Sequence, residues 1–289
     1  VYDGTTYHMY LLGGQDMSPL NSPYAVGHWS ASDLAGPWTE DPDNPVLEPD
    51  PGAWDGWTIY DLAVIYDGTG FHMWYGATDS YLGDVLVGYA TDADGSGDWT
   101  RVAGPLPGLE LGAPGTWDDR GLMPGAVLFD GRGYRMWYLA VKNEGPSYGT
   151  WRIGSATSKN GISWNKHPEP VLVGSEPWEG ENVYYPEVVS HGAGFAMWYS
   201  GFGVSLEAAT GYAVSPEGLS WGRWPSNPVL EPEPPCTLLE STAVVLEGGV
   251  AHGWFGHCGD IVYATSARDV VFFDGFETGD AGIWSGTFP

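Results

Sequence analysis

Histidines recur at one position of a repeated aromatic motif and are the first side chains to consider for chemistry. His8, His72 and His252 each stand just before the central residue of such a motif. Histidine binds transition metals and exchanges protons near neutral pH, so the set could indicate a metal site. Equivalent positions of a repeat protein lie on different repeats, however, and we therefore expect no shared metal. His257, beside Cys258 at a predicted turn, is interpreted as structural.

Cys236 and Cys258 are the two cysteines of the 289-residue chain. A small even number is typical of one disulfide in an exported protein, although two free buried thiols would give the same sequence. Cys236 precedes the predicted inner strand of the last repeat, and Cys258 follows its second strand. A hairpin brings such positions to one end of a sheet, so we predict a Cys236–Cys258 disulfide. The pair, together with a start at Val1 that suggests a removed leader, predicts a secreted, extracellular or periplasmic protein.

The elements that would position any site are given by an internal repeat. The motif Phe71-His72-Met73-Trp74-Tyr75 has four further copies, at intervals of 56 to 64 residues, in 7–10, 134–138, 195–199 and 251–255. A turn containing Gly after an acid or a histidine precedes each copy, and a Gly-containing strand and then, in four repeats, a Trp follow it. The same order of features in successive segments indicates five copies of one structural unit.

Each unit predicts four short strands joined by tight turns. Asp-Gly between apolar runs is a strong hairpin signal, and runs such as 62–66 are apolar on both faces, as in sheets covered on both sides. The prediction is an all-β, five-bladed β-propeller with four-stranded antiparallel blades over residues 1–270, followed by a C-terminal tail segment, 271–289. A β-sandwich with coincidental motifs is the alternative. Only Val1 and Tyr2 precede the first turn, so the first blade should lack most of its inner strand unless 270–273 completes a blade.

Composition and charge limit the partners. Aromatic residues make up 15% of the chain, and 37 acidic against 10 basic residues give a net charge of -27. Such a surface repels polyanions, so we expect no nucleic-acid partner, although the charge also serves plain solubility. No apolar run is long enough for a membrane-spanning helix, so no membrane insertion is expected. The sequence does not indicate the oligomeric state.

The repeat unit resembles that of the five-bladed β-propeller glycosidase superfamily. The resemblance is carried by Trp-Asp, an apolar strand, Asp-Gly, Met-Trp-Tyr, Gly-Tyr-Ala-Thr, Gly-Ile-Ser-Trp and Pro-Val-Leu, and it spans residues 2 to 268. The superfamily includes glycoside hydrolase families 43 and 32 and the mannoside phosphorylases of family 130, and similar repeats occur in exported proteins. The tail at 273–284 is similar to a short C-terminal segment of exported bacterial proteins. The resemblance implies a carbohydrate partner bound in a central funnel. It allows a structural calcium, but no oxygen-ligand loop supports one and no cofactor is expected.

The resemblance also implies carboxylates at the starts of the inner strands. Asp61, Glu187 and Glu240 lie seven, five and eight residues before the turn glycines of their units and are the candidate catalytic residues. Glycoside cleavage needs one carboxyl group to protonate the leaving oxygen and another to attack or to activate water. Glu187 is assigned as the general acid and Asp61 as the orienting or base residue. Because one residue of slip turns a strand side chain to the other face, these acids could instead cap strand ends.

The third unit departs from the superfamily pattern. Its corresponding stretch, 122–125, has no acid, and Asp119 and Arg120 just upstream are candidates for substrate binding. Sugar rings stack on aromatic side chains, so Trp57, Tyr60, Tyr184 and Tyr185 are further binding candidates. The periodic tryptophans at 54, 117 and 178 are interpreted as packing residues.

Two functional hypotheses follow from these residues. The first is a secreted glycoside hydrolase-like enzyme that cleaves a poly- or oligosaccharide with paired carboxylates. The second is a non-catalytic glycan-binding or scaffold propeller, which the missing acid of the third unit favours. The fold does not decide between them, because function depends on the site.

Overall fold

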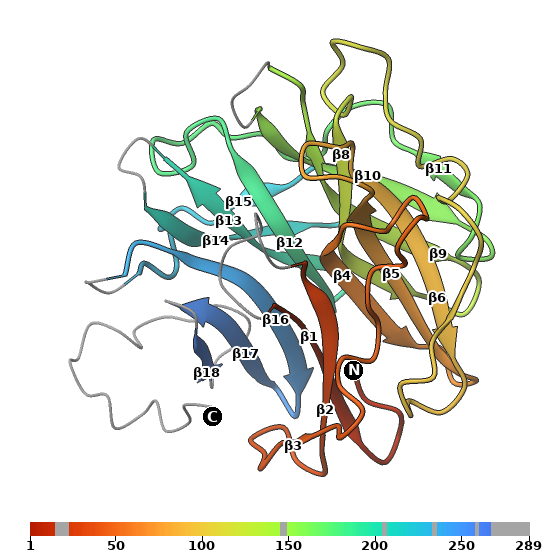
Figure 1. The fold of residues 1–289 in the computed structure, drawn as a ribbon. Helices are drawn as coiled ribbons and strands as arrows, with labels where there is room; N and C mark the ends of the chain where they lie inside the picture. The colour runs from red at the N-terminus through yellow and green to blue at the C-terminus, as the bar shows by residue number, and fades with distance from the viewer. Residues whose placement is uncertain (15–22, 145–148, 204–206, 233–235, 258–259, 267–289) are drawn as a thin grey trace. The chain divides into compact units, whose positions relative to one another are not determined.

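The computed structural model describes residues 1–14, 23–144, 149–203, 207–232, 236–257 and 260–266. Every regular element in these residues is a β-strand, and the strands form five antiparallel sheets in chain order (Figure 1). This confirms the predicted five-bladed β-propeller, and each sheet is one blade. Within the described residues, no helix is long and apolar enough to cross a membrane.

Three of the blades have four strands, arranged as up-and-down meanders. Blade 2 consists of β4 (Thr58–Tyr66), β5 (Phe71–Thr78), β6 (Leu86–Asp92) and β7 (Thr100–Arg101). Blade 3 consists of β8 (Gly121–Phe129), β9 (Tyr134–Val141), β10 (Trp151–Ser158) and β11 (Trp164–Lys166). Blade 4 consists of β12 (Val183–His191), β13 (Gly194–Phe202), β14 (Ala208–Ser215) and β15 (Gly222–Arg223).

The first and last blades have three described strands. Blade 1 contains β1 (Tyr7–Gly13), β2 (Ala25–Ala31) and β3 (Thr39–Glu40). Blade 5 contains β16 (Leu239–Glu247), β17 (Val250–His257) and β18 (Asp260–Ser266). The aromatic motif lies on the second strand of blades 2 to 5 but on the first strand of blade 1. Of an inner strand, blade 1 has within the described residues only the isolated pairing of Tyr2 with Tyr7, which confirms that most of this strand is missing there. The predicted tail, 271–289, lies outside them.

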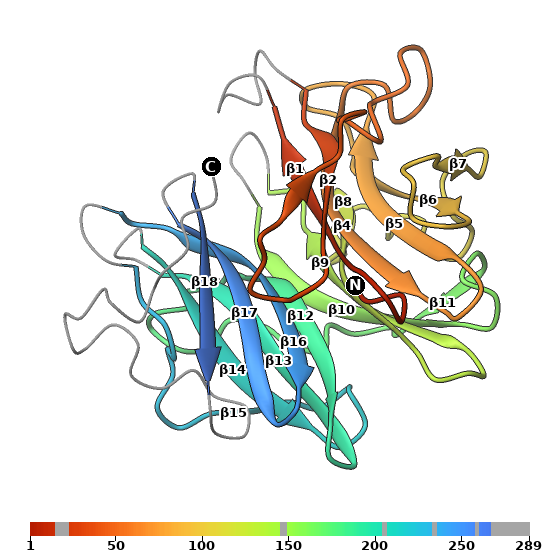
Figure 2. The same cartoon turned by 90° about the horizontal axis from the view of Figure 1, so that it is seen from below.

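The chain divides into two compact units. The first contains blades 1 and 2 with part of blade 3, and it comprises Val1–Met136, Val141–Asn143 and Ala156–Lys166. The second contains the rest of blade 3 with blades 4 and 5, and it comprises Trp137–Ala140, Glu144–Ser155 and His167–Pro289. In Figure 2 the successive strands of blade 4 lie side by side, in agreement with their hydrogen-bonding order.

The Asp-Gly turns behave as the sequence predicts. In blade 2, Tyr66 pairs with Phe71 across a four-residue turn, and Gly68 has a φ of 95°, a left-handed conformation that favours glycine. The Asp67 carboxylate accepts hydrogen bonds from the backbone N–H groups of Thr69 and Gly70, at 2.8 and 3.3 Å. The acid and the glycine therefore fix the hairpin through two different physical effects.

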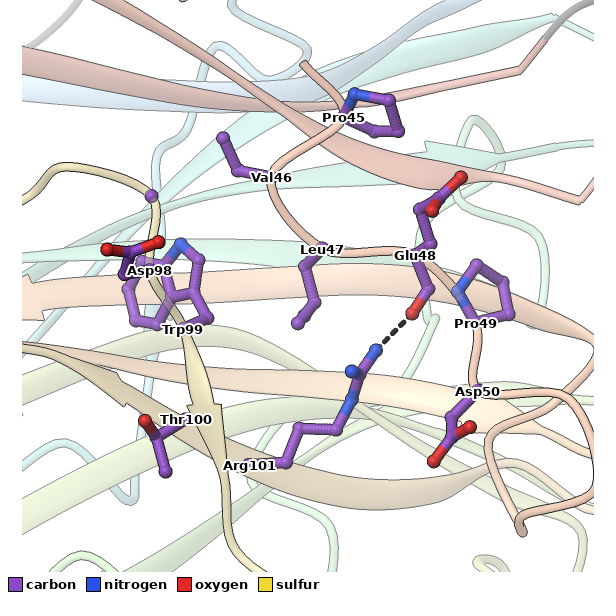
Figure 3. Close-up of a pocket in the computed structure, with 11 residues that line it drawn as sticks. Pro45, Val46, Leu47, Glu48, Pro49, Asp50, Asp98, Trp99, Thr100 and Arg101 are labelled. Carbon is purple, nitrogen blue, oxygen red and sulfur yellow. Dashed lines mark hydrogen bonds between the residues drawn. The ribbon is translucent and has the colours of Figure 1, made fainter. Parts of the chain in front are cut away.

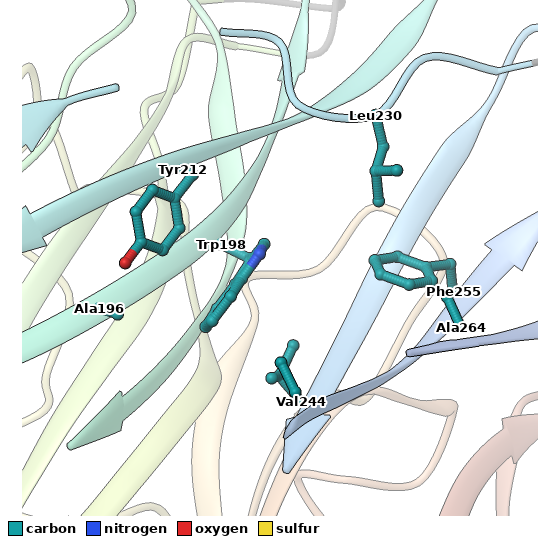
Figure 4. Packing of buried hydrophobic residues seen from close by; sticks show 8 residues of the cluster. Ala196, Trp198, Tyr212, Leu230, Val244, Phe255 and Ala264 are labelled. Carbon is teal, nitrogen blue, oxygen red and sulfur yellow. The ribbon is translucent and has the colours of Figure 1, made fainter. Parts of the chain in front are cut away.

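Buried aromatic and aliphatic side chains fill the space on both faces of the sheets. In the second unit, Trp198 and Tyr212 of blade 4 cluster with Val244 and Phe255 of blade 5 (Figure 4). In the first unit, Met73 and Tyr75 belong to a similar cluster with Val26 and Ile59. These strands are apolar on both faces because each is covered on both sides.

The start of each inner strand is held by the preceding blade. The N–H of Ile59 in β4 donates to the carbonyl oxygen of Tyr24 at 3.2 Å, and Thr58 Oγ1 accepts from the N–H of Tyr24 at 2.9 Å. In the same way, the N–H of Leu122 in β8 donates to Val85 at 3.0 Å. In the second unit, the N–H of Ala208 donates to Thr237, directly before β16, at 2.8 Å. These bonds place the strand starts on which the candidate acids lie.

Candidate active site

Asp61 lies in a β-bulge of the inner strand β4. Tyr60 pairs with Gly76 and Leu62 with Tyr75, so Asp61 is the extra residue that has no partner in β5. Its Oδ1 accepts a hydrogen bond from the N–H of Leu62 at 3.0 Å. Its Oδ2 is buried and has no hydrogen-bond partner in the described part of the chain. Bulges re-aim side chains and are frequent beside active sites.

The environment of Asp61 favours its protonated form. Burial raises the pKa of the carboxyl group from 3.8 to about 7, and the N–H of Leu62 only partly opposes this shift. A carboxyl group that titrates near neutral pH can donate a proton to a leaving group or accept one from water. Asp61 thus has the burial and the pKa expected of an acid–base residue.

Trp57 and Tyr60 precede Asp61 in the chain and belong to the first unit. Trp57 directly precedes β4, and its N–H donates to the carbonyl oxygen of Thr78 at 2.9 Å. The indole Nε1 of Trp57 is buried and has no partner within the described residues. Both rings are half-buried, so each keeps some surface for contact with a ligand.

Glu187 lies beside another bulge, in β12 of the second unit. It pairs with Trp198, and the register shifts between Tyr184 and Glu187. Its Oε1 accepts a hydrogen bond from the N–H of Val244 in β16 at 3.3 Å. This contact joins the side chain of Glu187 to the inner strand of blade 5.

The two tyrosines before Glu187 differ in exposure. Tyr184 is only 1% exposed and packs edge-on against Trp151, with ring centroids 4.9 Å apart. Tyr185 is half-buried and has a φ of 49° within the bulge, an unusual conformation for a residue with a side chain. Of the two, Tyr185 has the surface that stacking on a sugar would need.

The three candidate acids occupy different register positions. Relative to the repeated motif, Asp61 lies in the bulge opposite no residue, Glu187 lies opposite Trp198, and Glu240 in β16 lies opposite Gly256. Trp74, the counterpart of Trp198, faces Ala63 rather than an acid. The side chain of Glu240 lies outside the described residues.

Asp119 and Arg120 lie just before β8 and are tied to neighbouring backbone. The Asp119 carboxylate accepts hydrogen bonds from the N–H groups of Gly115 and Asn143, at 2.5 and 2.7 Å. Burial alone would raise the pKa of Asp119, but these backbone donors outweigh it and hold the pKa below its ordinary value. Arg120 donates its N–H to Val141 at 3.0 Å. Asp119 therefore fixes a loop as well as being a binding candidate.

A set of buried ion pairs was not anticipated from the sequence. In blade 2, Asp55 Oδ2 accepts from the Tyr75 hydroxyl at 2.9 Å and lies 3.2 Å from Arg101 Nε. In blade 3, Asp118 lies 2.6 Å from Lys166 Nζ. In the second to fourth repeats the acid follows the periodic tryptophan, and the base lies two residues after the second tryptophan. This spacing is the signal that could have revealed the pairs.

The same pairing recurs in blade 4, where Glu179 Oε1 accepts from the Tyr199 hydroxyl and from Arg223 Nε, both at 2.7 Å. The periodic Trp54 and Trp178 lie against the same tyrosines, at centroid distances of 6.0 and 5.8 Å. These tryptophans are therefore packing residues, as predicted.

A pocket of about 560 Å³ lies on the first unit, and Asp61 is not among its lining residues (Figure 3). Its walls are the segment after blade 1 and the outer strand of blade 2, and its lining residues are in 45–50 and 97–101. The Arg101 guanidinium group in this pocket already has protein partners, because it pairs with Asp55 and donates to the carbonyl oxygen of Glu48. We interpret the pocket as the polar junction of two blades.

The metal and disulfide predictions have different outcomes. The described residues contain no group of three or more His, Cys, Asp or Glu side chains that could hold a metal ion. Cys236 is 9% exposed, and Cys258 lies outside the described residues. The disulfide therefore stays a prediction.

No protein-family model matches the chain. The uncharacterized protein MT1551 of Mycobacterium tuberculosis is 29% identical over 147 residues, which are 48% of this chain and 45% of that protein. The β-1,2-mannobiose phosphorylase of Thermoanaerobacter sp. is 30% identical over 96 residues, which are 30% of this chain and 32% of the phosphorylase. The chain spans less than half the length of these curated relatives.

Solved structures match nearly the whole chain. A structure described as a glycoside hydrolase has a TM-score of 0.72 and 18% identity, with 96% of this chain and 89% of that chain covered. A glycosyl hydrolase from Bacteroides ovatus has a TM-score of 0.73 and 13% identity, with 94% and 83% covered. A family 130 protein, from a structure described as targeting β-1,2-mannosidic linkages in Candida mannan, has a TM-score of 0.70 and 14% identity, with 94% and 85% covered. The chain thus has the fold of the five-bladed β-propeller glycoside hydrolases.

Proposed function

We propose that this protein is an exported glycoside-cleaving enzyme in which Asp61 transfers a proton. The observation that carries the proposal is the Asp61 carboxyl group, whose buried Oδ2 has no partner among the described residues. An ionised carboxylate with an unpaired buried oxygen is costly, so stable folding alone gives no reason to keep one there. A pKa of about 7 suits acid–base catalysis, because the group exchanges protons readily at neutral pH.

Asp61, with its raised pKa, is the candidate general acid. The sequence pattern assigned this role to Glu187, and we propose Asp61 instead because burial favours its protonated form. Glu187 and Glu240, which belong to the second unit, are the candidates for the carboxyl group that attacks or activates water. Trp57, Tyr60 and Tyr185 would contact the sugar.

Names of similar proteins suggest the first substrates to test. Because one relative is a β-1,2-mannobiose phosphorylase and one structural neighbour is described with β-1,2-mannosidic linkages, the substrate class we propose is a mannose-containing oligosaccharide. Export is proposed from the acidic composition and the cysteine pair. The net charge of -27 favours a saccharide over an anionic polymer as the ligand.

The test is sugar release by wild type, Asp61→Asn and a matched control. β-1,2-Mannobiose and a panel of polysaccharides are incubated with the protein, with and without phosphate, so that free sugar and sugar phosphate are distinguished. Asp61→Asn should lower turnover about 10²- to 10⁴-fold. Asp67→Asn, on the turn at the other end of the same hairpin, should keep wild-type turnover. Equal turnover in wild type and Asp61→Asn would contradict the proposal.

A non-catalytic glycan-binding propeller is the second candidate function. It is favoured by the inner strand of blade 3, where Met123, Pro124 and Gly125 stand in place of an acid. Binding of a saccharide without release of sugar, with affinity lowered by Tyr185→Ala and unaffected by Asp61→Asn, would select this function.

A further inference from the structure

Four titratable side chains form an unbroken polar chain inside blade 1. Asp3 Oδ2 lies 3.3 Å from His8 Nε2, and His8 Nδ1 lies 3.0 Å from His28 Nε2. His28 Nδ1 in turn lies 2.8 Å from Asp41 Oδ2. The two histidines are only 7% and 4% exposed. Both ends of this chain are therefore carboxyl groups, and its centre is a contact between two imidazole rings.

The surroundings of the two rings are aromatic and tightly packed. Tyr10 stacks on His28 with centroids 4.8 Å apart, and Phe71 of β5 meets the edge of His8 at 4.8 Å. The turn after β6 also covers His8, since a Cβ placed on Gly95 would lie 2.8 Å from His8 Cε1. Water is thereby kept from the contact between the rings.

Further charged groups act near the rings. Asp92 raises the pKa of Tyr10 together with Asp41 and Asp3, after the larger effect of burial, so Tyr10 stays a neutral phenol. The Asp92 carboxylate is itself engaged by backbone N–H groups, which include those of Gly95 and Gly97. The amino group of Val1 donates to the carbonyl oxygen of His8 at 2.8 Å. Asp3 and Asp41 thus act on the two histidine rings, and Asp92 acts on Tyr10, which stacks on His28.

Counting the hydrogen-bond donors shows that the polar chain from Asp3 to Asp41 needs one proton more than two neutral imidazole rings carry. The pKa of Asp41 is lowered, chiefly by its bond to His28; Asp3 has a lowered pKa because backbone and side-chain donors outweigh its burial. Ionised carboxylates only accept, so the two end contacts use one N–H of each ring. A neutral imidazole has a single N–H. With two neutral rings, the central nitrogens would direct two lone pairs at each other across 3.0 Å.

Blade 2 provides an internal comparison. His72 occupies the place of His8, and Tyr89 occupies the place of His28, because Tyr10 pairs with His28 as Trp74 pairs with Tyr89. His72 Nε2 lies 3.0 Å from Asp67 Oδ2, and His72 Nδ1 bonds the hydroxyl of Tyr89. The hydroxyl can supply the hydrogen of that contact, so the contact between the two rings of blade 2 needs no extra proton. Blade 5 repeats the histidine–tyrosine contact, with His252 Nδ1 2.6 Å from the hydroxyl of Tyr263.

We propose that blade 1 binds one proton in the contact between His8 and His28, and that this proton locks β1 to β2. The charge resides on His28, since its 2.8 Å contact with Asp41 has the length of a charge-assisted bond, whereas His8 lies 3.3 Å from Asp3. Burial also lowers the pKa of His8, which agrees with a neutral His8 that accepts from His28. This site is independent of the proposed enzyme activity.

The lock predicts a loss of stability above neutral pH. Histidines of the unfolded chain have an ordinary pKa of about 6.5 and are mostly neutral at about pH 7.5. The folded protein holds one more proton there, so its free energy of unfolding falls as the pH rises. Deprotonation at alkaline pH leaves two facing lone pairs, and β1 then loosens from β2.

The first test is nitrogen-15 NMR of the histidine side chains in the whole chain. At pH 7.5 we expect His28 to give imidazolium signals and His8 to give neutral ones. Neutral signals from both His8 and His28 at pH 7.5 would overturn the proposal. This measurement needs no variant that might misfold.

The second test is thermal unfolding of wild type and His28→Tyr between pH 7 and 9.5. The substitution places in blade 1 the residue that blades 2 and 5 have at this position, so no extra proton is needed. Wild type should lose about 2 °C or more in Tm over this range, and His28→Tyr should lose less. His72→Gln, in blade 2, is the control and should keep the wild-type slope. Equal slopes for wild type and His28→Tyr would contradict the lock.

Discussion

Arg223 and Glu179 form a two-point ion pair although they are 44 residues apart: Arg223 Nε donates to Glu179 Oε1 at 2.7 Å, and a terminal guanidinium nitrogen donates to Oε2 at 3.0 Å. Glu179 is 0% exposed, and its carboxylate also accepts from the Tyr199 hydroxyl and from the N–H groups of Ser175 and Glu176. Burial alone would raise the pKa of Glu179, but these donors, Arg223 foremost, lower it. The pair therefore joins the loop before β12 to the outer strand β15.

Breaking this pair should destabilise the protein strongly. Glu179→Gln removes the negative charge but leaves Arg223 half-buried, so we expect a loss of about 3 kcal/mol in the free energy of unfolding. Arg223→Lys should also destabilise, because lysine keeps the charge but cannot donate at two points in one plane. Urea unfolding monitored by tryptophan fluorescence measures both. Glu176→Gln on the exposed surface nearby is the control, and a similar loss there would argue against a specific role of the pair.

Tryptophans of the repeated motif link neighbouring blades through hydrogen bonds from their indole N–H groups. Trp137 Nε1 donates to the carbonyl oxygen of Gly218, in a turn of blade 4, at 2.8 Å, and Trp74 does the same to Gly161 in blade 3. Trp137→Phe leaves a buried carbonyl unpaired and a small cavity, so we expect a loss of about 2–3 kcal/mol. Trp224→Phe, on a ring that is 37% exposed, should cost less than about 1 kcal/mol. Equal losses would mean that the Gly218 bond contributes little.

The repeat made the fold predictable, but the register of the inner strands was not. Asp-Gly turns and Met-Trp-Tyr strands are local signals, and each lies where the spacing placed it. Counting residues back from the turn cannot detect a bulge, which adds a residue to one strand only. Bulges in β4, β12 and β16 therefore set Asp61, Glu187 and Glu240 at different register positions.

The pKa shifts of the candidate acids could not be predicted from the sequence either. Asp61 and Asp119 both lie near the start of an inner strand, yet burial raises the pKa of one and backbone donors lower that of the other. Burial and hydrogen bonding depend on the folded surroundings rather than on the residue type. The basic residues that pair with Asp55 and Glu179 recur at a fixed spacing and could have been recognised from the sequence.

Removing the turn carboxylate Asp67 should lower stability at neutral pH. Burial would raise its pKa, but bonds from Thr69 and Gly70 and the ring of His72 hold it below the ordinary value. Asp67→Ala removes these bonds, and we expect a loss of about 1–2 kcal/mol at pH 7. Because the folded pKa is below that of the unfolded chain, the contribution is present above about pH 4 and disappears as the pH falls through the folded pKa. Wild type and variant should therefore approach each other in Tm at acid pH, and a constant difference would contradict this reasoning.

Asp61 should have the opposite pH dependence, because its folded pKa is raised. Between the ordinary value of 3.8 and about 7 the folded protein holds a proton that the unfolded chain has released, so stability contributed by this group falls as the pH rises through that window. Asp61→Asn cannot ionise and avoids the cost of a buried charge. We expect the variant to have a higher Tm than wild type at pH 8 and a similar Tm at pH 4, while its turnover is reduced. Scanning calorimetry at the two pH values measures this. A variant that is less stable than wild type at pH 8 would mean that the Asp61 carboxylate is satisfied in solution and would remove the basis for its role as the acid.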